Sequence, residues 1–170
     1  ANEGFKVEPW LIDRIVNAKG EIVYAADPLV ACSDCLDDSP SAIEEVRMED
    51  ILGAKVPEVR AAERVMDPRV AYIISTFLSD AIQRGTGRRA RILERQDIAG
   101  KTGTTNGPRD AWFSGFNRDL ITTTWVGFDD YGPLGRREFG GTAALPIWID
   151  FMRAALPAPQ PAQPMPPGIV

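Results

Sequence analysis

The sequence of 170 residues is 44% hydrophobic and 25% charged, which is ordinary usage for a globular protein with a sizeable core. Its net charge of −5, without a basic block, excludes nucleic acid and an anionic membrane surface from the expected partners. The absence of histidine excludes a Ser-His-Asp triad, a Cys-His pair and a His-ligated metal, so we expect neither a metal nor a cofactor.

The amino-terminal region predicts a β-hairpin. Two strand-like runs, 10–16 and 21–24, flank Asn17-Ala18-Lys19-Gly20, with glycine at the position that favours positive φ. The opening Ala1-Asn2-Glu3-Gly4 has neither an initiator methionine nor a signal-peptide pattern. No apolar run approaches the roughly 20 residues of a membrane span. We therefore expect the chain to be cut from a longer protein.

From residue 26 to about residue 62 the periodicity fades into an acidic stretch with several prolines. It predicts a surface excursion with one short helix near 41–45, and no chemistry is assigned to it. Both cysteines lie here, as Cys32-Ser33-Asp34-Cys35. Two ligands do not complete a four-ligand zinc site, and an acidic loop does not lower a thiol pKa. We interpret the pair as a local disulfide or two inert thiols rather than a catalytic element.

The clearest helix begins at Asp67-Pro68, a capping aspartate followed by proline at the first helical position, and ends at Arg84-Gly85. An apolar stripe with helical spacing runs along it, and we expect this stripe to be buried. Its members are Val70, Ile73, Ile74, Phe77, Leu78, Ala81 and Ile82. The following Gly85-Thr86-Gly87 is weak evidence for a phosphate site, because phosphate-binding glycines lie between a strand and a helix, the opposite order.

The central stretch is a predicted strand over 98–105 with an unusually bare backbone. Glycine weakens a strand, so Gly100 and Gly103 indicate a place where another group approaches the main chain closely. Alternation puts Thr102 and Thr104 on one face, where two hydroxyls suit a carboxylate, a phosphate or an oxyanion, and Lys101 adds a positive charge. An ordinary threonine-rich strand with a solvated lysine is the alternative, and these residues alone leave both open.

Two further strands, over 111–116 and 120–128, follow turns at 106–108 and 117–119 and predict a three-stranded antiparallel meander. A glycine-rich loop over 129–141 precedes a helix that starts near Pro146. We expect this helix to carry one apolar side, made of Ile147, Trp148, Phe151, Met152 and Ala155. The fold class is α+β, with helices packed on an antiparallel sheet. Residues 1–156 form the expected domain, and 157–170 form a proline-rich extended tail.

Several segments in this order resemble the C-terminal half of the transpeptidase domain of class A penicillin-binding proteins. They are Gly85-Thr86-Gly87, Lys101-Thr102-Gly103-Thr104, residues 110–116, residues 125–130 and residues 140–148. The resemblance covers about residues 65–156, and the hairpin fits it as well. It implies an antiparallel sheet covered by helices, as in penicillin-binding proteins and serine β-lactamases, which is incomplete in this chain.

What the resemblance implies is acyl transfer on stem peptides that end in D-Ala-D-Ala, with β-lactams as mimics of the substrate. Lys101 would supply positive potential for the terminal carboxylate, and the hydroxyls of Thr102 and Thr104 would bind it. Gly103 would keep the wall flat, and Thr105 would lie beside the substrate. The Thr104 N–H would form part of the oxyanion hole. The implied location is the periplasmic side of the inner membrane, with the membrane anchor on another segment.

The sequence departs from the family because it contains no Ser-x-x-Lys and no Ser-x-Asn. The nucleophile and its base therefore lie on another segment, expected N-terminal to this one, which is the main partner. This chain is one wall of an active site. Two alternatives remain: a serine β-lactamase or β-lactam sensor, which shares the strand but deacylates or signals, and a non-catalytic binding module.

Overall fold

The computed structural model describes residues 2–31 and 60–169. Its chain divides into two compact units, one over residues 2–67 and one over residues 68–170. Each unit is described by itself. The fold is α+β with small antiparallel sheets, as expected. Cys32, Cys35 and the helix predicted near 41–45 lie outside the described residues. No helix among the described residues is long and apolar enough to cross a bilayer.

The first unit contains the predicted hairpin, which is confirmed. Strands β1 (Arg14–Val16) and β2 (Ile22–Ala25) pair antiparallel. The first is shorter than the predicted run 10–16, and the second is shifted by one residue from 21–24. Gly20 has a φ of +83°, as the turn requires. The Asn17 side chain accepts hydrogen bonds from the backbone N–H of Lys19 at 2.9 Å and of Glu21 at 3.0 Å. All residues of both strands are exposed, so the hairpin is organised by its turn rather than by a core.

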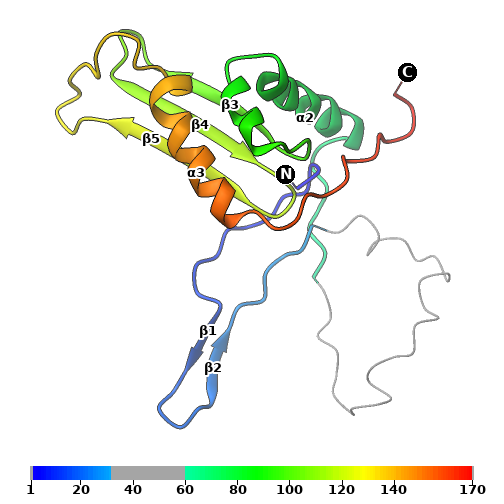
Figure 1. Ribbon diagram of the computed structural model, residues 1–170. Helices are drawn as coiled ribbons and strands as arrows, with labels where there is room; N and C mark the ends of the chain where they lie inside the picture. Colours follow the sequence, from blue (N-terminus) through cyan, green and yellow to red (C-terminus); the bar gives the residue numbers. More distant parts are fainter. Residues whose placement is uncertain (1, 32–59, 170) are drawn as a thin grey trace. The chain divides into compact units, whose positions relative to one another are not determined.

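The second unit is built on the predicted meander, which is also confirmed. Strands β3 (Ala99–Thr104), β4 (Asp110–Phe116) and β5 (Ile121–Gly127) form an antiparallel sheet in the order β3-β4-β5 (Figure 1). Because β3 lies at one end of this order, no described strand pairs with its outer edge. The strand that carries Lys101 is therefore an edge strand of the described sheet.

Helix α3 (Leu145–Ala155) lies across this sheet and closes the core (Figure 1). The expected apolar side is wrong in part: Leu145, Trp148, Ile149 and Met152 are buried, whereas Ile147 and Phe151 are 52% and 48% exposed. Trp148 sets this rotation, because its ring meets Phe113 edge-on, with centroids 4.9 Å apart. Gly115 leaves space for the Trp148 ring, since a Cβ at this position would lie 2.6 Å from it.

Helix α2 (Pro68–Gln83) begins where the sequence predicts, but most of its stripe is not buried. Ile82 is fully buried, while Val70, Ile73, Ile74 and Phe77 are between 39% and 67% exposed. The reason is that α2 packs mainly against β3 and the short 3-10 helix η2 (Arg88–Leu93). The buried side of α2 runs along the helix from Ala71 to Ile82. A neighbouring apolar face, made of Val70, Ile73, Ile74 and Phe77, stays open in the described chain.

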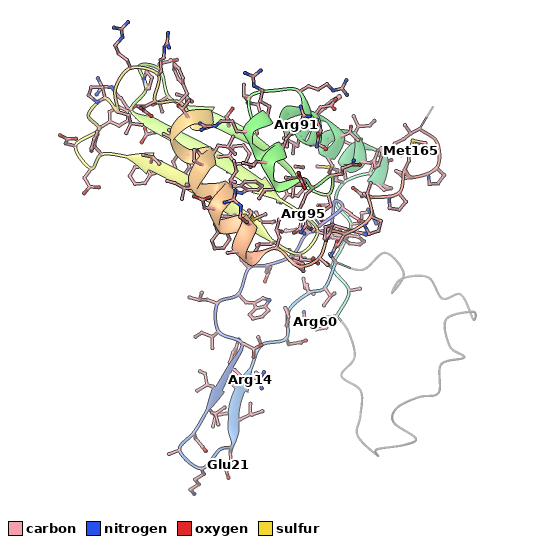
Figure 2. The ribbon with its side chains drawn as sticks, in the orientation of Figure 1. Arg14, Glu21, Arg60, Arg91, Arg95 and Met165 are labelled. Carbon is pink, nitrogen blue, oxygen red and sulfur yellow. The ribbon has the colours of Figure 1, made fainter. Side chains whose placement is uncertain are left out.

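Residues 156–169, which follow α3, form no helix or strand, but hydrogen bonds fix the first of them. Arg95 donates to the carbonyl oxygens of Pro157 and Ala158, and the backbone N–H of Gln160 donates to the Asp97 carboxylate at 3.2 Å. Arg95, labelled in Figure 2, forms an ion pair with Asp97, and their side chains are 8% and 3% exposed. Polar contacts just before β3, together with the packing of Leu156 on the core, therefore attach this segment.

Candidate active site

The candidate site is the outer edge of β3. Thr102 and Thr104 lie opposite Phe113 and Ala111, two buried residues of β4, so both threonines are on the α3 face of the sheet. Lys101 and Gly103 point to the other face, opposite Ser114 and Trp112. Alternation by itself would separate the Lys101 ammonium from the threonine hydroxyls.

The Lys101 side chain nevertheless reaches Thr102. Its Nζ donates to the Thr102 carbonyl oxygen at 3.1 Å and lies 3.4 Å from Thr102 Oγ1. This is possible because β3 is an edge strand, so a long side chain can bend around the open edge to the next residue. Lys101 forms no ion pair with any described residue. An exposed ammonium without a counter-charge thus lies beside a hydroxyl, an arrangement that suits an anionic group.

Thr102 also contacts a residue that we did not predict as part of the site. Its Oγ1 lies 2.7 Å from Oγ1 of Thr86, which follows α2. In the sequence, Gly85-Thr86-Gly87 is weak evidence for a phosphate site and part of the family resemblance, and no local pattern places it beside β3. The pairing joins residues 16 positions apart through the packing of α2 on β3.

The hydroxyls of Thr104 and Thr105 both accept backbone hydrogen bonds. Thr104 Oγ1 accepts from the N–H of Gly140 at 3.0 Å, at the start of the π-helical turn η3 (Gly140–Ala144). Thr105 Oγ1 accepts from the N–H groups of Arg109 and Asp110, at 3.2 and 2.9 Å, and so closes the turn between β3 and β4. Both hydroxyls keep their own proton, but the turn fills both acceptor positions of Thr105 Oγ1, whereas Gly140 fills one of the two on Thr104 Oγ1.

The bare backbone of β3 has two different explanations. A Cβ at Gly100 would lie 2.9 Å from the Phe113 ring and 2.8 Å from the Ser114 carbonyl oxygen, so this glycine serves the core. Gly103 lies at the other end, where Gly140 comes so close that a Cβ on Gly140 would be 2.6 Å from the Gly103 oxygen. The core thus explains the missing side chain at Gly100. A Cβ on Gly103 itself would meet only Trp112, whose Cβ would be the nearest atom at 3.2 Å.

Among the described serines, Ser114 on β4 is the one that pairs with Lys101 across the two strands. Its Oγ is paired with Thr123 Oγ1 at 2.9 Å, and the Lys101 ammonium turns away to Thr102. The residues described here therefore bring together a cation, two hydroxyls and an open strand edge, but no serine activated by a base.

No family model matches the chain, but searches among characterised proteins and solved structures give clear relatives. The chain is 46% identical to penicillin-binding protein 1A of Pseudomonas aeruginosa. This alignment covers the whole chain and 23% of that protein. It is 39% identical to penicillin-binding protein 1A of Neisseria lactamica, in an alignment that covers 18% of that protein. The crystal structure of penicillin-binding protein 1A from Haemophilus influenzae matches 99% of the chain with a TM-score of 0.80 and 36% identity, using 26% of that structure.

The chain thus spans about a fifth of the length of the relatives that it matches. Both the sequence identity and the structural agreement extend over nearly all of the 170 residues, so the likeness is not confined to the Lys-Thr-Gly stretch. The chain is homologous to one part of penicillin-binding protein 1A.

Proposed function

We propose that this chain is the C-terminal part of a class A transpeptidase domain, with residues 1–156 in the domain and 157–170 as a tail. Its β3 edge forms one wall of an acyl-transfer site that cross-links peptidoglycan stem peptides and is acylated by β-lactams. The observation that supports this most directly is the Lys101 ammonium bent around the open edge of β3 to Thr102. A cation and a hydroxyl at a strand edge suit an extended peptide that ends in a carboxylate.

Each predicted site residue has a role in this proposal. Lys101 and the Thr102 hydroxyl bind the terminal carboxylate. The Thr104 hydroxyl helps, because its bond from Gly140 occupies a lone pair and leaves its proton available. Gly103 leaves the wall without a side chain where the substrate lies, and the Thr104 N–H donates to the oxyanion. Thr105 supports this end of the strand through its turn hydrogen bonds.

The covalent chemistry belongs to another segment of the same protein. A serine oxygen there attacks the carbonyl carbon of the penultimate D-alanine, and a neighbouring lysine takes the hydroxyl proton. The C–N bond breaks and the terminal D-alanine leaves as the amine, with that proton. The amine of a second stem peptide then forms the new C–N bond, and the serine oxygen recovers a proton as its bond to carbon breaks.

The open face of α2 supports such a partner segment. Val70, Ile73, Ile74 and Phe77 gather exposed apolar area on one helix, and burying each such side chain contributes about 1.5–3 kcal/mol. We propose that the segment with the nucleophile covers this face, that a membrane anchor lies elsewhere in the protein, and that the domain works on the periplasmic side of the inner membrane.

The test is labelling of the intact protein by a fluorescent penicillin, followed by proteolysis and identification of the labelled peptide. We expect one label, on a serine outside these 170 residues, that persists for hours. A label on a serine within this chain would contradict the division of roles. A label that hydrolyses within seconds would instead identify a β-lactamase.

A further inference from the structure

A pair of hydroxyls joins the candidate site to the end of helix α2. Thr86 Oγ1 and Thr102 Oγ1 are 2.7 Å apart, and either atom can be the donor. We propose that Thr86 is a positioning residue of the site, which donates its hydroxyl proton to Thr102 and so leaves the Thr102 proton for the carboxylate of the ligand. This inference rests on the proposed function, since it concerns how Thr102 meets an anion.

The direction of this hydrogen bond follows from the capacity of each hydroxyl. A threonine hydroxyl has one proton and two acceptor positions. Lys101 Nζ lies 3.4 Å from Thr102 Oγ1 and occupies one acceptor position there. If Thr86 donates to the second, the Thr102 proton is the only hydrogen-bonding capacity left, and it is the part that attracts a carboxylate. If Thr102 donates to Thr86 instead, a lone pair of the Thr102 hydroxyl faces the carboxylate of the ligand. The hydroxyl oxygen and the carboxylate oxygen then repel each other.

Thr86 is suited to be the donor because the structure gives its side chain no other partner among the described residues. The orientation in which Thr102 donates therefore leaves the exposed Thr86 proton with no acceptor among the described residues, only solvent. An anion beside Lys101 selects the other orientation. The two hydroxyls then act as a short chain, in which each bond polarises the next.

The backbone around Thr86 holds this position. The N–H of Gly87 donates to the Ala81 carbonyl oxygen at 2.9 Å, and that of Gly85 donates to Asp80 at 3.2 Å, so the segment is tied to the end of α2. On the far side, a Cβ at Gly141 would lie 3.0 Å from the Thr86 carbonyl oxygen and 3.8 Å from Thr102 Cγ2. The end of α2, β3 and η3 therefore meet at this hydroxyl pair.

The experiment compares acylation of the intact protein by a penicillin and by the methyl ester of the same penicillin, which lacks the negative charge. Thr86→Val removes the hydroxyl with little change in shape, and Thr86→Ser restores it. We expect Thr86→Val to slow acylation by the free acid about threefold to tenfold, the factor for one hydrogen bond of ordinary net strength. Acylation by the ester should be unchanged, and Thr86→Ser should react like the wild type with both.

Thr123→Val is the matched control. It breaks a similar hydroxyl pair, Ser114 with Thr123 at 2.9 Å, in the same sheet but two strands away from β3. We expect it to leave both rates unchanged. If Thr86→Val slows the acid and the ester equally, its role is merely structural and the inference is overturned. A Thr86→Val protein with wild-type rates overturns it as well. If that variant does not fold, Thr86→Ala takes its place in the same comparison.

A double-mutant comparison separates this inference from the proposed function. Thr102→Val should slow acylation by the free acid, and adding Thr86→Val should cause no further loss, because Thr86 acts through the Thr102 hydroxyl. If Thr102→Val by itself has no effect, the proposed role of Thr102 fails, and this inference fails with it. If Thr102→Val slows the reaction and Thr86→Val adds an independent loss, only the inference about Thr86 fails.

Discussion

The ammonium of Lys101 lies 3.1 Å from the carbonyl oxygen of Thr102, although the two side chains leave β3 on opposite faces of the sheet. The lysine bends around the outer edge of the strand, which no described strand occupies. A positive charge, a hydroxyl and unpaired edge backbone are thus gathered within two consecutive residues.

We predict that Lys101→Ala in the intact protein lowers the second-order rate of acylation by a reporter penicillin about tenfold to a thousandfold. The physical reason is the loss of one charge-assisted contact in the reacting complex, worth about 1.5–4 kcal/mol. Stopped-flow measurement with a fluorescent penicillin checks this. Lys6→Ala, a lysine of the other unit, is the control and should react normally. A Lys101→Ala rate within twofold of wild type, in a folded protein, would remove Lys101 from the site.

We predict that Gly140→Ala damages the site through the backbone. The new Cβ would lie 2.3 Å from the Trp112 carbonyl oxygen and 2.6 Å from that of Gly103, and neither is the end of a flexible side chain. Overpacking of this kind costs about 1–3 kcal/mol. Unfolding in urea should show that loss, and acylation should slow because β3 moves.

Gly132→Ala is the control for that change, since its Cβ would meet chiefly the movable Asp130 carboxylate, at 3.1 Å. Equal stability of the Gly140→Ala and Gly132→Ala proteins would show that η3 yields easily and does not hold the end of β3.

We predict that the open face of α2 binds the rest of the protein. Residues 1–170 expressed alone should aggregate or remain molten, and co-expression with the complementary segment should keep both parts associated. Phe77→Ser should weaken that association about tenfold to a hundredfold, because it removes one large side chain from the buried face. Ile92→Ser is the matched control, because Phe77 and Ile92 are both 67% exposed but Ile92 lies on η2, outside this face. Equal affinities for the two variants in pull-down or calorimetry would refute the assignment of this face.

We predict that the Arg95–Asp97 pair stabilises the second unit in a pH-dependent way. The hydrogen bond from Arg95, assisted by that from the Gln160 N–H, lowers the pKa of Asp97 below its usual range. The stabilisation is therefore present above the ordinary aspartate pKa of about 3.9 and is lost as the pH falls through the lower folded-state pKa. Asp97→Asn should cost about 1.5–3 kcal/mol near neutral pH, because it removes the charge-assisted hydrogen bonds to the guanidinium and leaves only Asp119 nearby as a counter-charge.

Urea unfolding from pH 7 to pH 2 measures this, and the difference between wild type and Asp97→Asn should shrink towards acid. Asp80→Asn breaks a mostly exposed pair with Arg84, so it should cost less than about 1 kcal/mol. Limited proteolysis after Leu156 should become faster in Asp97→Asn, because Asp97 and Arg95 hold residues 157–160. A difference that does not depend on pH would contradict the proposed cause.

The sequence by itself determined the elements of this protein and most of their order. The hairpin around Asn17 and Gly20, the start of α2 at Pro68 and the three strands of the meander all follow from local patterns. Such patterns are local because turn geometry and the periods of strand and helix involve residues close in the chain. The Lys-Thr-Gly stretch was also visible, as a bare strand with a single lysine.

Only the tertiary structure decided which faces are buried and which side chains meet. Trp148 rather than Ile147 enters the core because Gly115 opposite it has no side chain, a fact about packing between distant residues. Most of the α2 stripe stays open because the described chain packs on the side of the helix that carries Ala71 and Ile82. Lys101 reaches Thr102 because β3 is at an edge, and Thr86 reaches Thr102 because α2 ends beside β3. Strand order and helix packing join residues far apart in the chain, and no local pattern records them.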